Sequence, residues 1–315
     1  MDTLYIVVPC YNEEEVLPET ARRLREKMHS LMDRGKISGR SRILLVNDGS
    51  SDRTWELITQ LHMSDRLFEG ISLSRNRGHQ NALLAGLMTA RRYADMVISM
   101  DADLQDDIEV VDAMVEKYYA GCDIVYGVRS SRKKDTFFKR FTAESYYRLI
   151  NSMGGQVVFN HADYRLMSRR ALDALSQYGE VNLFLRGIVP MLGYKTGIVE
   201  YERGKRFAGE SKYPLKKMLA FAAEGITSLS ARPLRWILFL GTATLAASLI
   251  LLVVFLVGAC LGRSMLNWRI VLFAVFFVGG LILLSIGIVG EYVGKIYLET
   301  KRRPRYFIES ALHHD

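Results

Sequence analysis

The chain has 315 residues, 49% of them hydrophobic and 24% charged, and it carries a net charge of +8 with a pI near 9.3. A net positive charge is typical of proteins that bind nucleic acid, but the sequence contains no nucleic-acid-binding signature. We therefore expect the basic residues to face anionic lipid headgroups and phosphates. Cys10, Cys122 and Cys260 lack metal-ligand spacing and are expected to be reduced and structural.

Along the first 230 residues, short apolar runs alternate with helical patterns, which predicts an α/β domain with a mixed, mainly parallel sheet. The predicted strands are Leu4–Pro9, Arg42–Asn47, Gly70–Ser74, Met96–Met100 and Asp123–Val128. The predicted helices are Glu13–Leu31, Ser51–Leu61, Gln80–Arg92 and Ile108–Tyr119. Open α/β sheets bind ligands beyond the carboxyl ends of their strands, so the polar turns there are the candidate site.

The first two predicted strands end in polar turns that open helices. Pro9 to Glu14 follows the first strand, and Asn47 to Asp52 follows the second. Asp48 is predicted to accept hydrogen bonds from a nucleoside, and Gly49 allows another backbone to come close. One such turn is a weak signal, whereas two on neighbouring strands indicate a binding site.

The fourth predicted strand ends in two carboxylates, Asp101 and Asp103, followed by the amide of Gln105. Oxygen ligands of this kind suit Mg²⁺ or Mn²⁺, with a nucleotide's phosphates completing the shell, and they do not suit zinc. The alternative is an acidic turn that caps the next helix through Asp106 or Asp107. That alternative leaves Asp101 and Asp103 crowded together without a counter-charge, so we favour the metal site.

Two uncharged apolar stretches, Trp236–Leu261 and Ile270–Gly290, lie near the end of the chain. Each is long enough for a helix to cross about 30 Å of hydrocarbon. A buried hairpin in a soluble core is the less favoured alternative. The sequence therefore predicts a catalytic domain tied to a membrane, with a lipid as one substrate.

Basic residues surround the two predicted spans, whereas the link between them, Gly262–Arg269, holds only Arg263 and Arg269. The flanking residues are Lys205, Arg206, Lys212, Lys216, Lys217, Arg232, Arg235, Lys295, Lys301, Arg302, Arg303 and Arg305. By the positive-inside rule, both ends of the chain are cytosolic and the link lies outside. No secretory signal is evident at the N-terminus, which fits a cytosolic domain on the inner (plasma) membrane.

Four regions are expected along the chain. Residues 1–212 form the cytosolic domain, 213–234 an amphipathic juxtamembrane segment, 235–294 the two-helix membrane hairpin and 295–315 a basic cytosolic tail. The amphipathic segment fits a helix in the interface plane as well as one packed on the cytosolic domain.

The ordered motifs resemble those of family 2 glycosyltransferases with the GT-A fold. The shared segments are Val8-Pro9-Cys10-Tyr11-Asn12-Glu13, Asn47-Asp48-Gly49-Ser50-Ser51-Asp52, Ser74-Arg75-Asn76-Arg77-Gly78 and Asp101-Ala102-Asp103-Leu104-Gln105. Further segments are similar to those of polyprenyl-phosphate glycosyltransferases, which include bactoprenol glucosyltransferases and dolichol-phosphate mannose synthases. These are Asp163-Tyr164-Arg165-Leu166-Met167, Phe184-Leu185-Arg186-Gly187, Arg206 to Tyr213 and Arg303-Pro304-Arg305-Tyr306-Phe307.

The resemblance implies a role for each matching position. The nucleoside would be held by Pro9, Tyr11, Glu13 and Asp48, with Arg77 and Gly78 beside the donor. The metal on the diphosphate would be held by Asp101, Asp103 and Gln105. The acceptor phosphate would be faced by Arg129, Arg206, Ser211 and Lys212, with Arg140 a weaker member of the same group. The catalytic set would be Asp103, Asp163 and Arg206.

The resemblance also implies the reaction, an inverting transfer of a hexose from a nucleotide sugar to polyprenyl (undecaprenyl) phosphate. UDP-glucose is favoured, and the other sugars stay open. The acceptor phosphate is largely ionised at neutral pH and needs little help from a base. Asp163 is therefore expected to orient the acceptor or the sugar, and a salt bridge to Arg165 or a nearby arginine is the alternative.

Two other functions remain as alternatives. A processive polysaccharide synthase shares the early motifs, but its Q-x-x-R-W motif and additional spans are missing from the sequence. A non-enzymatic membrane scaffold would not require the acidic and basic motifs together. The lipid-linked sugar would serve cell-envelope glycosylation after a flippase and a second glycosyltransferase act on it, and homo-oligomerisation is left open.

Overall fold

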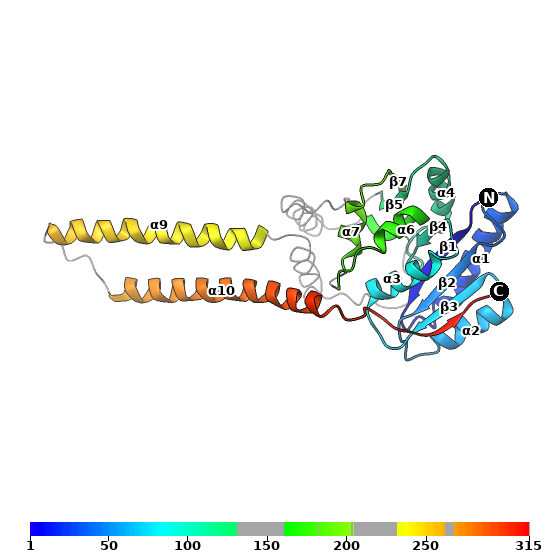
Figure 1. The fold of residues 1–315 in the computed structure, drawn as a ribbon, viewed down its shortest axis with the longest axis horizontal. Coiled ribbons are helices and arrows are strands. Elements are labelled where there is room, and N and C mark those ends of the chain that lie inside the picture. Colours follow the sequence, from blue (N-terminus) through cyan, green and yellow to red (C-terminus); the bar gives the residue numbers. More distant parts are fainter. Residues whose placement is uncertain (131–160, 182, 203, 205–231, 262–267, 315) are drawn as a thin grey trace.

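The computed structural model describes residues 1–130, 161–181, 183–202, 204, 232–261 and 268–314. Its strands are β1 (Leu4–Cys10), β2 (Arg42–Asn47), β3 (Phe68–Leu73), β4 (Met96–Ser99), β5 (Ile124–Arg129), β6 (His161–Ser168), β7 (Thr196–Tyr201) and β8 (Ile308–Leu312). Within the described chain they form one sheet in the order β7-β5-β6-β4-β1-β2-β3-β8 (Figure 1). Strands β4, β1, β2 and β3 run parallel, as do β5 and β7, whereas β6 and β8 are antiparallel to their neighbours. The expected mixed, mainly parallel α/β sheet is confirmed.

Helices cover both faces of this sheet. They are α1 (Leu17–Asp33), α2 (Thr54–Ser64), α3 (His79–Ala90), the 3-10 turn η1 (Ile108–Val110), α4 (Val111–Tyr119), α6 (Arg169–Leu175) and α7 (Leu185–Met191). One apolar cluster joins the sheet to α1, α2 and α4, and a second joins its other face to α3, α6 and α7. Successive residues of β1 alternate between the two clusters, because side chains along a strand point to opposite faces. This arrangement fixes the ends of the central strands, where the candidate site lies.

The five predicted strands are all present, with ends displaced by at most two residues. Strands β6, β7 and β8 were not predicted, and neither were α6 and α7. The predicted helix at Ile108–Tyr119 is present as η1 followed directly by α4.

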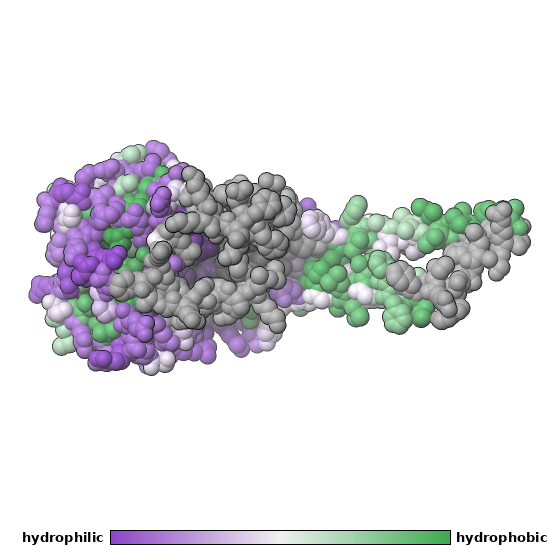
Figure 2. Space-filling model, turned by 180° about the vertical axis from the view of Figure 1, so that it is seen from behind, coloured by the Kyte–Doolittle hydropathy of each residue, from purple (hydrophilic) through white to green (hydrophobic). Residues whose placement is uncertain are grey.

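Two long helices, α9 (Arg232–Cys260) and α10 (Trp268–Lys301), extend away from the sheet domain in the same direction (Figure 1). Their apolar windows, Leu234–Leu251 and Ala274–Lys301, have mean hydropathies of 1.8 and 2.2, and neither is buried within the protein. Figure 2 shows the contrast between these apolar helices and the largely hydrophilic surface of the sheet domain. Both helices are long and apolar enough to cross a membrane.

Helix α10 continues past the predicted end of the second span, Gly290, as far as Lys301. At 1.5 Å per residue its 34 residues measure about 51 Å, which exceeds the hydrocarbon thickness. The extra turns carry the helix to the sheet domain, and the chain then continues along that domain to form β8 beside β3 (Figure 1). Of the amphipathic juxtamembrane segment, residues 213–231 lie outside the described residues.

Candidate active site

The turns after β1 and β2 are joined by hydrogen bonds between their backbones and side chains. The amide of Asn12 donates to Ser50 Oγ at 3.0 Å, and Asn12 Oδ1 accepts from the amide of Ser51 at 2.9 Å. The amide of Glu13 donates to Thr54 Oγ1 at 2.9 Å. The two polar turns therefore form one continuous surface at the carboxyl edge of the sheet, with Tyr11 exposed on it.

Asp48 holds the loop that follows β3. Its Oδ1 accepts from the amide of Arg77 at 2.7 Å and its Oδ2 from the amide of Gly78 at 2.9 Å. Gly49, at φ +62°, lets this loop come close, because a Cβ there would lie 2.5 Å from the backbone of Arg75 and Asn76. The predicted close approach at Gly49 is thus made by the protein's own loop, and a contact between Asp48 and a nucleoside stays a prediction.

The acidic turn after β4 is supported from below by α1. Thr20 Oγ1 donates to the carbonyl oxygen of Ala102 at 2.8 Å, and Leu104 has a positive φ of 56°. The amide of Gln105 donates to Asp103 Oδ1 at 3.1 Å. The turn is therefore held in one conformation, with Asp101, Asp103 and Gln105 all partly buried at the carboxyl edge.

A cluster of charges joins this acidic turn to β6, α3 and α7. His79, the first residue of α3, places Nε2 3.5 Å from Asp101 Oδ1 and 3.6 Å from Asp163 Oδ2. Asp163 is also 2.9 Å from Arg165 Nη2 and 2.9 Å from Arg186 Nη2. Both salt bridges considered for Asp163 from the sequence are therefore present, and a third partner is added.

The contacts within this cluster shift the pKa values of its members. Although burial alone would raise it, the charges of Arg186, His79 and Arg165 hold the pKa of Asp163 well below its ordinary value. Burial would lower the pKa of His79, but Asp163 and Asp101 raise it to about 9. Burial raises the pKa of Asp101, with Asp163 and Asp103 adding to the effect and His79 opposing it. The expectation that Asp101 lacks a counter-charge is wrong, because His79 supplies one.

His79 and Arg186 were not chosen as site residues from the sequence. Each stood inside or directly beside a quoted motif, His79 after Ser74–Gly78 and Arg186 within Phe184–Gly187. No spacing in the sequence connects them with Asp163, since the contact depends on β6 lying beside β4.

Arg129, at the end of β5, is held by a buried tyrosine and carboxylate. Its Nε donates to Tyr201 Oη at 3.4 Å, and its Nη2 lies 3.9 Å from Asp106 Oδ1. Tyr201 in turn donates to Asp106. Burial raises the pKa of Asp106 to about 6, with Asp101 adding to the effect and Tyr201 and Arg129 opposing it. Arg129 thus lies close to the acidic turn, and its contact with an acceptor phosphate stays a prediction.

The described chain contacts the acidic turn at Gly204, just before the segment that carries Arg206. The amide of Gly204 donates to the carbonyl oxygen of Gln105 at 2.9 Å. The residues after it, among them Arg206, Ser211 and Lys212, lie outside the described residues, as does Arg140. The described residue that precedes this segment is therefore hydrogen-bonded to the backbone of the predicted metal turn.

The donor atoms of the acidic turn are of the kind that a hard divalent cation prefers. Among the described residues, no group of three or more His, Cys, Asp or Glu side chains is placed to hold a metal ion. The carboxylates of Asp101 and Asp103 and the amide oxygen of Gln105 nevertheless fit magnesium or manganese. A cation there would also oppose the burial and the neighbouring carboxylates that raise the pKa of Asp101.

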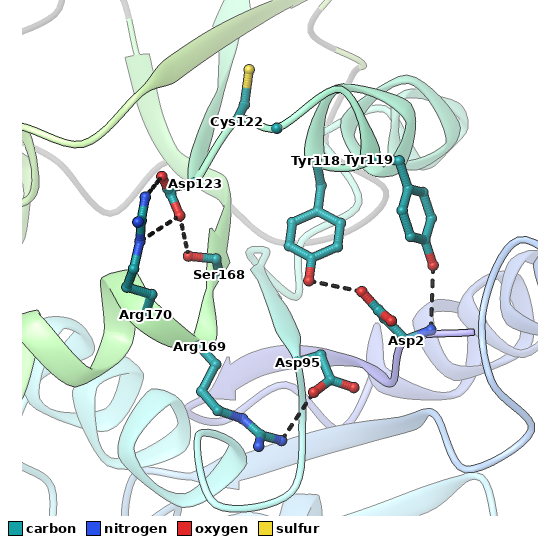
Figure 3. Close-up of a pocket in the computed structure, with 10 residues that line it drawn as sticks. Asp2, Asp95, Tyr118, Tyr119, Cys122, Asp123, Ser168, Arg169 and Arg170 are labelled. Carbon is teal, nitrogen blue, oxygen red and sulfur yellow. Dashed lines mark hydrogen bonds and ion pairs between the residues drawn. The ribbon is translucent and has the colours of Figure 1, made fainter.

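A cavity of about 530 Å³ lies at the opposite, amino end of the strands and is distinct from this site (Figure 3). Its charges are paired with one another, Asp95 with Arg169 at 3.2 Å and Asp123 with Arg170. Tyr118 Oη donates to Asp2 at 2.9 Å. With these groups already paired and the strand carboxyl ends on the far side, the cavity is not the predicted site.

The comparisons with known proteins agree with the motifs. The family model described as glycosyl transferase family 2 matches residues 5–176. The chain is 50% identical over 312 residues to an uncharacterised glycosyltransferase of Bacillus subtilis (strain 168), YkoT, covering 99% of this chain and 93% of that protein. It is 40% identical to a bactoprenol glucosyl transferase of Shigella phage SfX, covering 97% of this chain and 98% of that protein.

Among solved structures, the fold is similar to that of a mannosyl-3-phosphoglycerate synthase from Rubrobacter xylanophilus. The TM-score is 0.50 at 17% sequence identity, with 75% of this chain and 74% of that chain covered. This likeness agrees with the GT-A fold expected from the motifs.

Proposed function

The chain belongs to glycosyl transferase family 2, and we propose that it transfers a hexose from a nucleoside diphosphate sugar to a polyprenyl phosphate at a membrane surface. One observation carries the proposal. The likeness to the bactoprenol glucosyl transferase runs over 97% of this chain and therefore includes both apolar helices as well as the family domain. Glucose is the favoured sugar and UDP the favoured nucleotide.

The donor would lie on the carboxyl edge of β1 to β4. The surface made by the turns after β1 and β2 receives the nucleoside, with Pro9, Tyr11, Glu13 and Asp48 as its predicted contacts. Arg77 and Gly78, in the loop that Asp48 holds, then lie beside the donor. Because this loop is hydrogen-bonded in place before the donor arrives, less ordering accompanies binding.

Asp101, Asp103 and Gln105 would hold a magnesium or manganese ion on the donor's diphosphate. The ion would stabilise the negative charge that develops on the departing nucleotide. In our proposal His79 supplies a counter-charge to Asp101 and Asp163 on the protein side of the site.

The acceptor brings its own nucleophile, because a phosphomonoester is largely ionised at neutral pH. The task left to the protein is to hold the phosphate oxygen in line with the anomeric carbon. Arg129, Arg206, Ser211 and Lys212 are the proposed phosphate contacts, with Arg140 a weaker candidate. Attack from the face opposite the nucleotide gives inversion, from an α-linked donor to a β-linked lipid phosphate.

Asp163 would act as an anchor in this reaction and not as a base. A carboxylate that pairs with two arginines and a histidine, and whose pKa lies well below its ordinary value, is a poor proton acceptor at neutral pH. In our proposal it orients Arg186 and His79 towards the donor sugar or the acceptor.

The test is transfer of radiolabelled sugar from a panel of nucleotide sugars to polyprenyl phosphate, with the full chain in detergent or vesicles. One sugar per lipid, from one preferred donor, supports the proposal. A polymer of many sugars would favour the processive alternative instead. Absence of any lipid-linked product across the panel would refute the proposed acceptor.

A further inference from the structure

The segment that leaves α10 continues along the sheet domain and is attached to it at successive points (Figure 1). We define the C-terminal tail as residues 302–314. Just before it, Glu299 Oε2 accepts from the amide of Val181 at 2.8 Å. Within it, Arg305 donates to the carbonyl oxygen of Tyr178, and Tyr306 packs against the apolar cluster under α3, α6 and α7. The tail is thus fastened at its start to the segment that follows α6.

Further on, the tail becomes part of the sheet. Strand β8 pairs with β3, with Ile71 opposite Ala311 and Ser72 opposite Ser310. At the far end, His313 Nδ1 lies 2.9 Å from Glu69 Oε2, whose side chain is only 4% exposed. Side-chain and backbone contacts therefore hold β8 over its whole length.

The pairing reaches the loop beside the donor. The amide of Ser74 donates to the carbonyl oxygen of Phe307 at 3.1 Å, directly beyond the last paired residues of β3 and β8. Ser74 is the first residue of the loop Ser74–Gly78, whose other end is held by Asp48. The loop is therefore fixed at one end by the tail and at the other by the turn after β2.

We propose that the C-terminal tail is a positioning element of the donor site, which holds the loop Ser74–Gly78 in its donor-binding conformation and connects it to α10. This inference rests on the proposed function, because it takes that loop as the donor's neighbour. A loop without fixed ends must be ordered when the ligand binds, and that cost lowers affinity. Loss of the tail's pairing therefore weakens donor binding and leaves the acceptor contacts on the other side of the site unchanged.

A different role for β8 would be to cover the edge of β3 against pairing with other chains. The two roles predict different measurements. An edge cover changes stability or aggregation, whereas a positioning element changes the dissociation constant of the nucleotide and the KM for the donor.

The experiment uses two proline variants of the full chain in detergent, Ser310→Pro and Ala311→Pro. Successive amides along a strand point to opposite sides, so one of these two residues donates towards β3 and the other points away from it. Proline removes the amide at each position. We call the variant that loses the amide donated to β3 the inward variant. The other, whose amide points away from β3, is the outward variant and serves as the matched control. Hydrogen exchange of the β3 amides identifies which variant has lost the pairing.

In the inward variant the dissociation constant of UDP and the KM for the donor rise about five- to tenfold, and the KM for the acceptor stays within about twofold. In the outward variant, the dissociation constant of UDP, the KM for the donor and the KM for the acceptor all stay within about twofold of the wild-type values. An inward variant that transfers sugar with unchanged UDP affinity and donor KM overturns the inference. A wild type that neither binds UDP nor transfers sugar refutes the proposed function first, and the inference falls with it.

If both proline variants fail to fold, Arg305→Ala decides the question, because it removes one tail contact and leaves β8 intact. Faster hydrogen exchange at residues 74–78 together with weaker UDP binding supports the inference. Unchanged exchange and unchanged UDP binding in Arg305→Ala overturn it.

Discussion

Replacing Asp163 with asparagine removes the charge on which Arg165, Arg186 and His79 converge, while keeping the shape of the side chain. Arg165 is only 1% exposed and would be left buried without the carboxylate with which it pairs. Removing one partner of a buried ion pair costs about 3 to 5 kcal/mol. A domain of this size melts about 2 to 4 °C lower for each kcal/mol lost, so Asp163→Asn should melt about 10 °C below the wild type. Intrinsic fluorescence during heating of the full chain in detergent measures the change.

The matched control removes the other partner as well. Arg165→Met in the Asp163→Asn background replaces the uncompensated guanidinium with an apolar side chain of similar length. It should recover about half of the lost stability or more, because a buried pair is often replaced by apolar residues at little cost. Two results would refute the reasoning: Asp163→Asn melting within about 2 °C of the wild type, or the effects of the two substitutions simply adding.

Three further predictions concern the reaction and the membrane. Asp103→Ala should abolish transfer in a protein that still folds. Wild-type activity should disappear with EDTA and return with magnesium or manganese. Full turnover in metal-free buffer would contradict the metal site. Arg206→Ala should lower the rate of transfer about 30-fold or more, because a charge-assisted phosphate contact at a partly desolvated site is worth about 2 to 5 kcal/mol. The choice of nucleotide sugar should not change. Near-normal rates in the transfer assay would place the acceptor site towards Arg129 instead. A reporter fused after Asp315 should be cytosolic, and its detection on the outer side would exclude the two-span topology.

The central strands and the turns after them could be predicted because their signals are local. Each of β1 to β5 is a short and mainly apolar segment. A polar turn directly follows each of β1, β2 and β4 in the chain. The sheet order then brings these turns together without any further information, since β4, β1, β2 and β3 are parallel neighbours. That is why Asp48, Asp101 and Asp103 could be assigned to one edge from the sequence.

The parts that the sequence did not predict depend on contacts between distant segments. Strand β6 contains Asp163 and Arg165, two charged residues that are buried because each neutralises the other, so it lacks an uninterrupted apolar run. Strand β8 is five residues long and mostly exposed at an edge, and its pairing with β3 has no signal in its own composition. The role of His79 is hidden for the same reason, because its partners come from β6 and from the turn after β4.

Strand β8 also bears on the topology, independently of the charges. Its pairing with β3 requires the chain after α10 to lie on the same side of the membrane as the sheet domain. If α9 crosses the membrane, α10 must cross it back, so the two helices form a hairpin whose link alone is on the far side. The lysines and arginines around the helices point to the cytosol as the near side. Both arguments together support our proposal that sugar transfer takes place on the cytosolic leaflet. The proposal in turn predicts that another protein moves the lipid-linked product across the membrane before a second enzyme uses it.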